Sequence, residues 1–304
     1  MTEKATKHRS LKDQRNRTYF LFLAGPVALF LISYVYSVGY TINLSLHAWD
    51  GISPVSRFVG LGNYISLLNS ARFENAVLNN LRWLAFYLVV PTLLGLSIAL
   101  LLDGRLKGEG FFKTIIFLPY IITPVAVSAV WRWLYVPDGG LFNAVLTVVG
   151  LGDYTQNWLG DRDIVNFSMM IAALWCATGF SFLVFYSGLR SIPQEYIEAA
   201  RIDGASSFSI FWNIILPQLW PSTILVVGLF GIDAMRIFDI VWSMSGGGPA
   251  RASEVLATQL YDVGFATFQM GMASAIGVCQ LIMAAVLILP YIIYIAGRVE
   301  DHGE

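Results

Sequence analysis

Six long apolar stretches account for much of this chain and restrict its fold more than any other feature. A helix that crosses the hydrocarbon of a membrane needs about 20 mainly apolar residues. Six stretches reach that length, at residues 19–44, 83–102, 114–133, 164–189, 222–244 and 271–296. Charged residues make up only 13% of the 304 residues, against roughly 25% in soluble domains. The sequence therefore predicts an all-α integral membrane protein with six transmembrane helices.

Prolines lie within several of these stretches, and we expect each of them to kink a continuous helix. They are Pro26, Pro91, Pro119 and Pro124. Proline is tolerated inside a membrane helix when neighbouring groups satisfy the carbonyls that it leaves free. The pattern is therefore typical of helices packed in a bundle.

The lysine and arginine residues predict the orientation of the chain. Twelve of the 19 fall in the polar segment 1–18 or on its side of the membrane, six fall on the other side, and Arg236 lies within a span. Because cytoplasmic loops carry the excess of positive charge, both termini are expected in the cytoplasm. Residues 1–18 then form a cytoplasmic tail, and residues 19–304 form the transmembrane domain.

The chain has no recognisable catalytic, metal-binding or nucleic-acid-binding pattern. Its three histidines, His8, His47 and His302, lie far apart, and none has the spacing of a metal ligand pair. No Gly-x4-Gly-Lys-Ser/Thr pattern occurs, which excludes ATP hydrolysis by that chemistry on this chain. The net charge of -1 and the lack of a basic patch argue against nucleic acid as a partner. We expect no enzymatic activity and no cofactor or metal ion on this chain.

A polar segment between the fourth and fifth apolar stretches predicts a compact pair of helices. Pro193 is expected in the first turn of a helix that is capped near Ser191. Gly204 can end this helix, since glycine tolerates the left-handed conformation. A second short helix, 208–216, is expected to stop before Pro217. A rigid unit of this kind can transmit force, which a flexible loop cannot.

This segment resembles the "EAA loop" of the permeases of binding-protein-dependent ABC importers. The matching residues have the spacing of that motif and are Glu198, Ala199, Ala200, Gly204, Ile214, Leu216 and Pro217. The resemblance implies that the loop, 191–220, docks on a separate ATPase dimer and couples ATP hydrolysis to transport. The residues expected to carry this coupling are Glu198, Ala199, Ala200, Asp203, Gly204, Leu216 and Pro217.

Two further motifs resemble the carbohydrate branch of this family. Residues 58–64 are similar to its first outer loop, and Phe238-Asp239 with 245–249 is similar to its Phe-Asp…Thr-Gly-Gly-Gly-Pro signature, with Ser245 in place of threonine. This signature belongs to the maltose/glycerol-phosphate type and to the first of its two paired subunits. The resemblance implies a type I ABC importer fold and import of a mono-, di- or oligosaccharide, with glycerol-3-phosphate or a polyol as the alternative.

The same resemblance implies a set of partners and a location. A second permease subunit, a cytoplasmic ATPase dimer and an extracytoplasmic solute-binding protein are expected beside this chain in the lipid bilayer of a bacterial inner membrane. ATP and magnesium are expected on the ATPase rather than on this chain.

Charged residues in the fifth apolar stretch leave two interpretations open. Asp233, Arg236 and Asp239 are spaced so that neighbours lie near one helical face. Ionisable groups at membrane depth normally face a polar cavity or one another. The residues therefore contact the solute, or Asp233 and Arg236 form an internal pair that stabilises the helix.

By resemblance to the maltose branch, the solute path is expected along the spans on either side of the EAA loop. The candidate residues on the earlier span are Ala173, Trp175, Cys176, Ala177 and Phe180, and those on the later span are Asp233, Ala234, Arg236 and Ile237. The polar amide positions of that branch are Ala173, Ala234 and Ile237 here, so the identity of the sugar does not carry over. Trp175 and Phe180 either stack on a sugar face or pack between helices.

Overall fold

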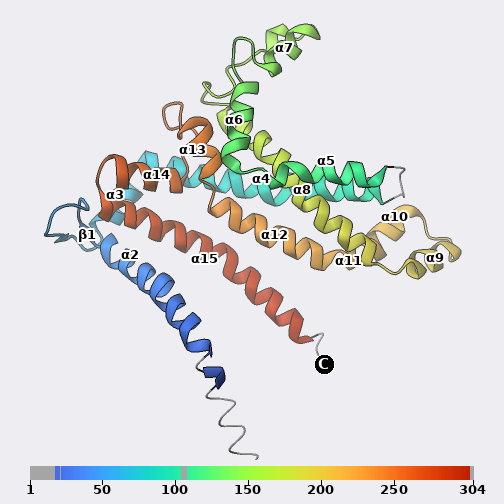
Figure 1. Ribbon diagram of the computed structural model, residues 1–304, viewed down its shortest axis with the longest axis horizontal. Helices are drawn as coiled ribbons and strands as arrows, with labels where there is room; N and C mark the ends of the chain where they lie inside the picture. The colour runs from blue at the N-terminus through green and yellow to red at the C-terminus, as the bar shows by residue number, and fades with distance from the viewer. Residues whose placement is uncertain (1–17, 21, 104–107, 302–304) are drawn as a thin grey trace, which may run out of the picture.

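The computed structural model describes residues 18–20, 22–103 and 108–301 and is built almost wholly of helices (Figure 1). In the described part of the chain the single sheet is a two-stranded antiparallel ribbon, β1 His47–Ala48 with β2 Arg57–Phe58. The predicted tail lies outside the described residues apart from Thr18, and so do Arg105 and Lys107.

The first and last helices of the chain lie side by side. The first, Thr18–Ser45, includes a π-helical segment η1 Leu31–Tyr36 and the α-helix α2 Ser37–Ser45. The last, α15 Met270–Asp301, packs against α2 near the β1–β2 ribbon (Figure 1).

Between them lie the long helices of the bundle and several short ones. The long helices are α4 Ala71–Leu102, α5 Glu109–Ile121, α6 Pro124–Leu134, α8 Val165–Ser191 and α12 Trp220–Met235. The short ones are α3 Gly62–Leu68, α7 Leu141–Val148, η2 Gly152–Tyr154, α9 Gln194–Ile202, α10 Ser207–Ile210, η3 Phe211–Ile215, α11 Leu216–Gln218, α13 Asp239–Ser245, α14 Leu256–Tyr261 and η4 Asp262–Ala266.

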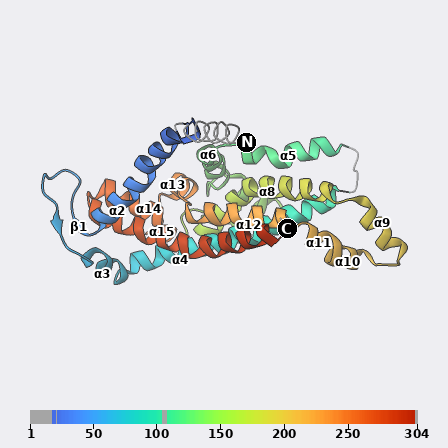
Figure 2. The ribbon, with the colours of Figure 1, turned by 90° about the horizontal axis from the view of Figure 1, so that it is seen from below.

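Most of the long helices run along one axis, whereas α6 turns away from α5 by 101°. The EAA segment and the 58–64 motif lie at opposite ends of this axis. Figure 2 shows α4, α5, α8, α12 and α15 along the long axis, with α9 and α10 at one end and β1 and α3 at the other. The centre of the bundle is the contact between α4 and α8. There a side chain on Gly95 would lie 2.6 Å from the backbone nitrogen of Phe182. Glycine at this position therefore allows the two helices to approach closely.

Four helices of the described chain are long and apolar enough to cross a membrane, and two bent helix pairs bring the number to as many as six. The prediction of six spans agrees with this upper number. The fifth span is displaced from its predicted position, since its bent pair is Ser207–Gln218 with Trp220–Met235, at 62°. Two of the predicted continuous helices are also wrong. The third is α5 and α6, which meet at 101°. Ile122 and Thr123 are extended there, because the residue before Pro124 is sterically excluded from the helical region.

The fifth predicted helix, 222–244, is also interrupted. α12 ends at Met235, Arg236 leaves the helical conformation, and α13 begins at Asp239. The last turn of a helix leaves carbonyl groups without partners. Here Asn80 Nδ2 donates to the carbonyl of Ala234 at 3.3 Å, and Gln280 Nε2 donates to the carbonyl of Met235 at 2.6 Å. Side chains from α4 and α15 thus satisfy the end of α12, which makes the break stable.

The second predicted helix begins twelve residues too late, because α4 starts at Ala71 rather than near residue 83. Its first three turns mix polar and apolar residues and lack the continuous apolar run of a span. Their polar side chains find partners in the segment after α13: Arg72 Nη2 lies 2.5 Å from Glu254 Oε1 and 2.5 Å from Asp262 Oδ2. A window that looks for apolar residues cannot detect a helical extension held by such contacts.

The motif at residues 58–64 has a structural role in the described chain. Asn63, in the first turn of α3, donates from its Nδ2 to the carbonyls of Ser45 at 2.7 Å and His47 at 3.0 Å. Ser45 is the last residue of the first helix, and His47 begins β1. The motif therefore ties the ribbon and α3 to the end of that helix.

Candidate functional site

A cavity of about 280 Å³ lies where the two broken helices meet α8. Ile122 lines it from the break between α5 and α6, and Ile237 and Phe238 line it from the break between α12 and α13. Non-helical backbone at membrane depth is tolerated where it is covered by protein or lines a polar cavity. Both interruptions of the predicted spans thus open onto one site.

The cavity brings together most of the predicted solute-path residues. From α8 come Ala173, Cys176 and Ala177, whose spacing places them on one face of that helix. From the end of α12 and the segment after it come Asp233, Arg236 and Ile237. Residues that lie 56 or more positions apart in the sequence therefore form one wall.

Three other predicted residues do not line this cavity. Trp175 is 41% exposed and turns its ring toward Trp131, at 6.2 Å between ring centroids. Phe180 packs against the rings of Tyr120 and Phe230, both of which line the cavity, at 5.2 and 5.8 Å. Ala234 is fully buried and holds the end of α12 through its carbonyl. Phe180 thus packs against two rings of the cavity wall without lining the cavity itself.

The charged residues of the site face the cavity without pairing. In the described chain no ion pair within 4.0 Å joins Asp233 to Arg236 or to another charged side chain. Both side chains are exposed, and so is Asp239, which also lines the cavity at the start of α13. The internal pair that the spacing allows is absent because Arg236 is no longer helical, with φ at -99° and ψ at 7°.

Several lining residues were not predicted from the sequence. Four of them are aromatic: Tyr87, Tyr120, Phe230 and Phe238. Aromatic faces with a small number of polar groups are typical of small-molecule pockets. A tyrosine within an otherwise apolar stretch, as at Tyr87 and Tyr120, is the sequence signal that points to such a site.

The EAA segment forms a helical unit at the end of the bundle opposite to the β1–β2 ribbon (Figure 1). Its first helix, α9, has no buried residue, and Glu198 accepts a hydrogen bond from Gln194 at 2.8 Å. Glu198, Ala199, Asp203, Gly204 and Pro217 are exposed, whereas Ala200 and Leu216 are half-buried. Gly204 has a φ of +81° and turns the chain toward α10, as expected.

Two details of the predicted helix pair are wrong. Pro193 precedes α9 as its cap residue instead of lying in the first turn, since its ψ of 125° is extended. The second helix does not stop before Pro217 but continues through η3 and α11 to Gln218. Pro217 lies in the first turn of α11, where a missing backbone N–H is tolerated.

The Gly-Gly-Gly-Pro segment forms a tight loop after α13. Gly246 and Gly247 have φ values of +60° and +85°, in a region where glycine is favoured. Ser245 Oγ accepts from the backbone N–H of Gly247 at 3.2 Å and lies 2.8 Å from Ser253 Oγ. The hydroxyl of Ser245 therefore makes the contacts that close this loop.

Comparison with known proteins identifies the family. Residues 92–297 match the family described as "Binding-protein-dependent transport system inner membrane component". The trehalose/maltose transport system permease protein MalF of Thermococcus litoralis is 33% identical over 285 residues, which cover 93% of this chain and 95% of that protein. The alpha-glucoside transport system permease protein AglF of Rhizobium meliloti is 33% identical over 296 residues, which cover 95% and 84% of the two chains.

A solved structure shares the fold. A chain of the bacterial ABC transporter involved in the import of the acidic polysaccharide alginate superposes with a TM-score of 0.81 at 22% identity and covers 96% of this chain and 99% of its own length. The predicted fold, an all-α ABC importer permease, is therefore confirmed. With the family match over two thirds of its length, this chain belongs to the binding-protein-dependent transport system inner membrane components, the permeases of ABC importers.

Proposed function

We propose that this chain imports a mono-, di- or oligosaccharide, together with a second permease subunit and a separate ATPase dimer. The observation that carries the proposal is the cavity between α8 and the breaks at Ile122 and Ile237. Its wall combines aromatic rings with charged side chains, which suits a hydroxylated solute. Relatives named for transport of trehalose/maltose, diacetylchitobiose and alpha-glucosides support the same class of solute.

A second candidate class is a polyol or glycerol-3-phosphate. The permease GgtC of Synechocystis, named for uptake of osmoprotective compounds, is 36% identical over 265 residues. A small polyhydroxylated solute would also fit a cavity of about 280 Å³.

The proposal assigns the coupling role to the EAA segment. Tyr196, Ile202 and Phe208 are 56%, 86% and 74% exposed on or beside α9, which is unusual for large apolar side chains in a segment with few other apolar contacts. Burial of these side chains against the ATPase would stabilise the complex. The proposed orientation places this end in the cytoplasm and the β1–β2 ribbon on the side of the solute-binding protein.

An uptake assay tests the proposal. The chain, its partner permease, the ATPase and the binding protein are reconstituted in proteoliposomes, and ATP-dependent entry of labelled maltose, xylose and glycerol-3-phosphate is measured. Cys176→Trp fills the cavity and should lower uptake at least tenfold. Ile171→Trp adds the same bulk on an exposed part of α8 and should leave uptake near the wild-type rate. ATP-dependent uptake that is equal in the two variants would contradict the assigned site.

A further inference from the structure

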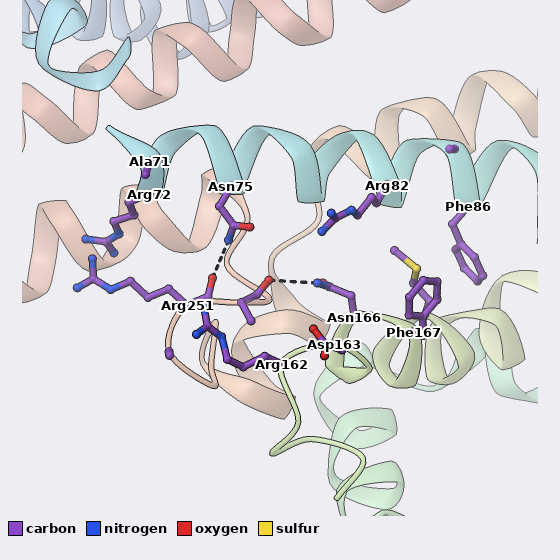
Figure 3. Close-up of a pocket in the computed structure, with 14 residues that line it drawn as sticks. Ala71, Arg72, Asn75, Arg82, Phe86, Arg162, Asp163, Asn166, Phe167 and Arg251 are labelled. Carbon is purple, nitrogen blue, oxygen red and sulfur yellow. Dashed lines mark hydrogen bonds between the residues drawn. The ribbon is translucent and has the colours of Figure 1, made fainter. Parts of the chain in front are cut away.

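A second and larger cavity, of about 990 Å³, lies at the end of α8 farthest from the EAA segment (Figure 3). Its walls are the first turns of α4, the first turns of α8 and the loop around Arg251. Figure 3 shows that arginine side chains from all three segments approach this space.

The lining of this cavity has an excess of positive charge, because it holds four arginines and the single carboxylate of Asp163. Arg72 is neutralised by Glu254 and Asp262, and Arg251 lies 3.9 Å from Asp262. Across the part of the chain that the structure describes, Arg82 and Arg162 form no ion pair within 4.0 Å. The amino-terminal ends of two long helices, α4 and α8, add partial positive charge. Arginine guanidinium groups in this setting favour carboxylate or phosphate.

One wall of the cavity is fixed by asparagine side chains. Asn75 Nδ2 donates to the carbonyl of Arg251 at 2.8 Å, and Asn79 Nδ2 donates to the carbonyl of Ala252 at 2.8 Å. Arg82 Nη1 donates to Asn79 Oδ1 at 2.8 Å. Arg251 has a φ of +65°, a conformation that costs free energy for a residue with a side chain. The side chain of Arg82 and the backbone at Arg251 are thus held in place before a ligand arrives.

A buried polar atom in the same wall points to a second property of the ligand. Asn166 is 7% exposed and donates from Nδ2 to the carbonyl of Ala252 at 3.1 Å. Its Oδ1 has no hydrogen-bond partner within the described chain. A buried acceptor of this kind costs free energy unless a donor reaches it. A hydroxyl group on the ligand would supply that donor.

The two cavities follow one another along a single face of α8. Asn166 and Met170 line the larger cavity, and Ala173 and Ala177 line the smaller one. Steps of three and four residues keep these side chains on one face of a helix. A solute that leaves the larger cavity toward the EAA end therefore meets the smaller one next.

We propose that the larger cavity is an outer binding site for a sugar that carries a carboxylate or a phosphate group. This inference rests on the proposed function and narrows the class of solute to anionic sugars. Its size lies at the upper end of the range for small-molecule pockets, roughly 300–1,000 Å³. The unpaired Asn166 oxygen and the continuity with the smaller cavity favour a hydroxylated solute over the acidic side chains of a docking protein.

Equilibrium binding to the assembled transporter, without its binding protein, tests this inference. Calorimetry with D-glucuronate and D-glucose 6-phosphate should show binding of at least one, with D-glucose at least tenfold weaker. The anion that binds identifies carboxylate or phosphate as the recognised group. The double variant Arg82→Gln/Arg162→Gln should lower the affinity at least tenfold. Arg57→Gln, on the exposed strand β2, should leave it unchanged.

Several results would overturn the inference. Equal binding of glucose, unaltered binding in the double variant, or inorganic phosphate binding as tightly as glucose 6-phosphate would each do so. If the double variant binds both anionic sugars as the wild type does but docks the binding protein more weakly, the arginines belong to the docking site for that protein. If the double variant fails to assemble, Arg162→Gln alone, at an exposed position before α8, provides the same comparison with an expected threefold or greater loss.

The uptake assay separates this inference from the proposed function. Import of maltose at equal rates by the wild type and the double variant, without binding of anionic sugars, would refute the outer site and leave sugar import intact. If the wild-type transporter imports none of the sugars, the proposed function itself is refuted.

Discussion

Asp233 and Arg236 face one cavity without forming an ion pair, and this arrangement predicts only weak coupling between their effects on stability. Each is expected to lower solute uptake when replaced by alanine, because both line the cavity. Arg236 attracts Asp233 electrostatically without an ion pair within 4.0 Å, so the coupling between Asp233→Ala and Arg236→Ala in the free energy of unfolding should not exceed about 0.5 kcal/mol.

The pair Arg72 and Glu254 supplies the control for this double-mutant cycle. Their side chains are 2.5 Å apart, and Glu254 is only 4% exposed. Contacting charges in one network typically show coupling of about 0.5–3 kcal/mol. If the coupling energy between Asp233 and Arg236 is as large as that between Arg72 and Glu254, the two residues form a stabilising pair. They would then not belong to the solute path.

Some residues of the two cavities could be predicted from the sequence, and others could not. Ala173, Cys176 and Ala177 were predicted from the resemblance to the maltose branch, and the period of a helix places them on one face. Tyr120 was not, since its place in the cavity depends on the 101° bend between α5 and α6. Arg82 and Arg162 were counted among the loop charges, because the 79 residues between them give no local sign that they share a cavity.

Helix α4 and helix α8 approach one another at Gly95, and their packing gives a prediction at the scale of elements. A methyl group on Gly95 would lie 2.6 Å from Phe182 N and 2.7 Å from Ser181 Cβ. Overpacking of this kind typically costs about 1–3 kcal/mol. Gly95→Ala should therefore lower the melting temperature of the transporter. Gly110→Ala, on α5 with no neighbouring atom within 4 Å, is the matched control and should not lower it.

The turn at Gly204 gives a second prediction at this scale, for coupling rather than stability. A residue with a side chain in the left-handed conformation costs roughly 1–2 kcal/mol, and asparagine costs less than valine. Because α9 buries no residue within this chain, the strain of Gly204→Val should loosen α9 locally and change the melting of the bundle little. It should lower stimulation of the ATPase by loaded binding protein, whereas Gly204→Asn retains most of it. Equal stimulation in the wild type and the valine variant would count against the coupling role.

The two interrupted spans differ in how far the sequence reveals them. The break before Pro124 has a local cause that the sequence contains, because proline excludes the helical conformation from Thr123. The end of α12 has no such local cause. It depends on amides of Asn80 and Gln280, which lie on α4 and α15 and reach the carbonyls of Ala234 and Met235. Helix ends that are satisfied from other helices cannot be located from the local sequence.

At the scale of the whole molecule, this chain leaves a charged face open that a membrane protein would normally cover. Asp233, Arg236 and Asp239 are exposed around the smaller cavity. Ionisable groups at membrane depth are costly unless they face a polar cavity or a partner. We therefore expect the second permease subunit to complete the enclosure and to stabilise this chain.

A melting experiment with and without the partner permease measures this dependence. At a partner concentration 100 times the dissociation constant, binding stabilises the folded chain by about 2.7 kcal/mol. Since 1 kcal/mol shifts the melting temperature of proteins of this size by roughly 2–4 °C, the complex should melt at least about 5 °C above the isolated chain. The variant Asp233→Asn/Arg236→Gln/Asp239→Asn removes the charges that need cover, so its two melting temperatures should lie closer together. If the isolated wild-type chain is monodisperse and melts at the same temperature as the complex, the charged face needs no partner. The cavity alone would then keep these charged groups hydrated.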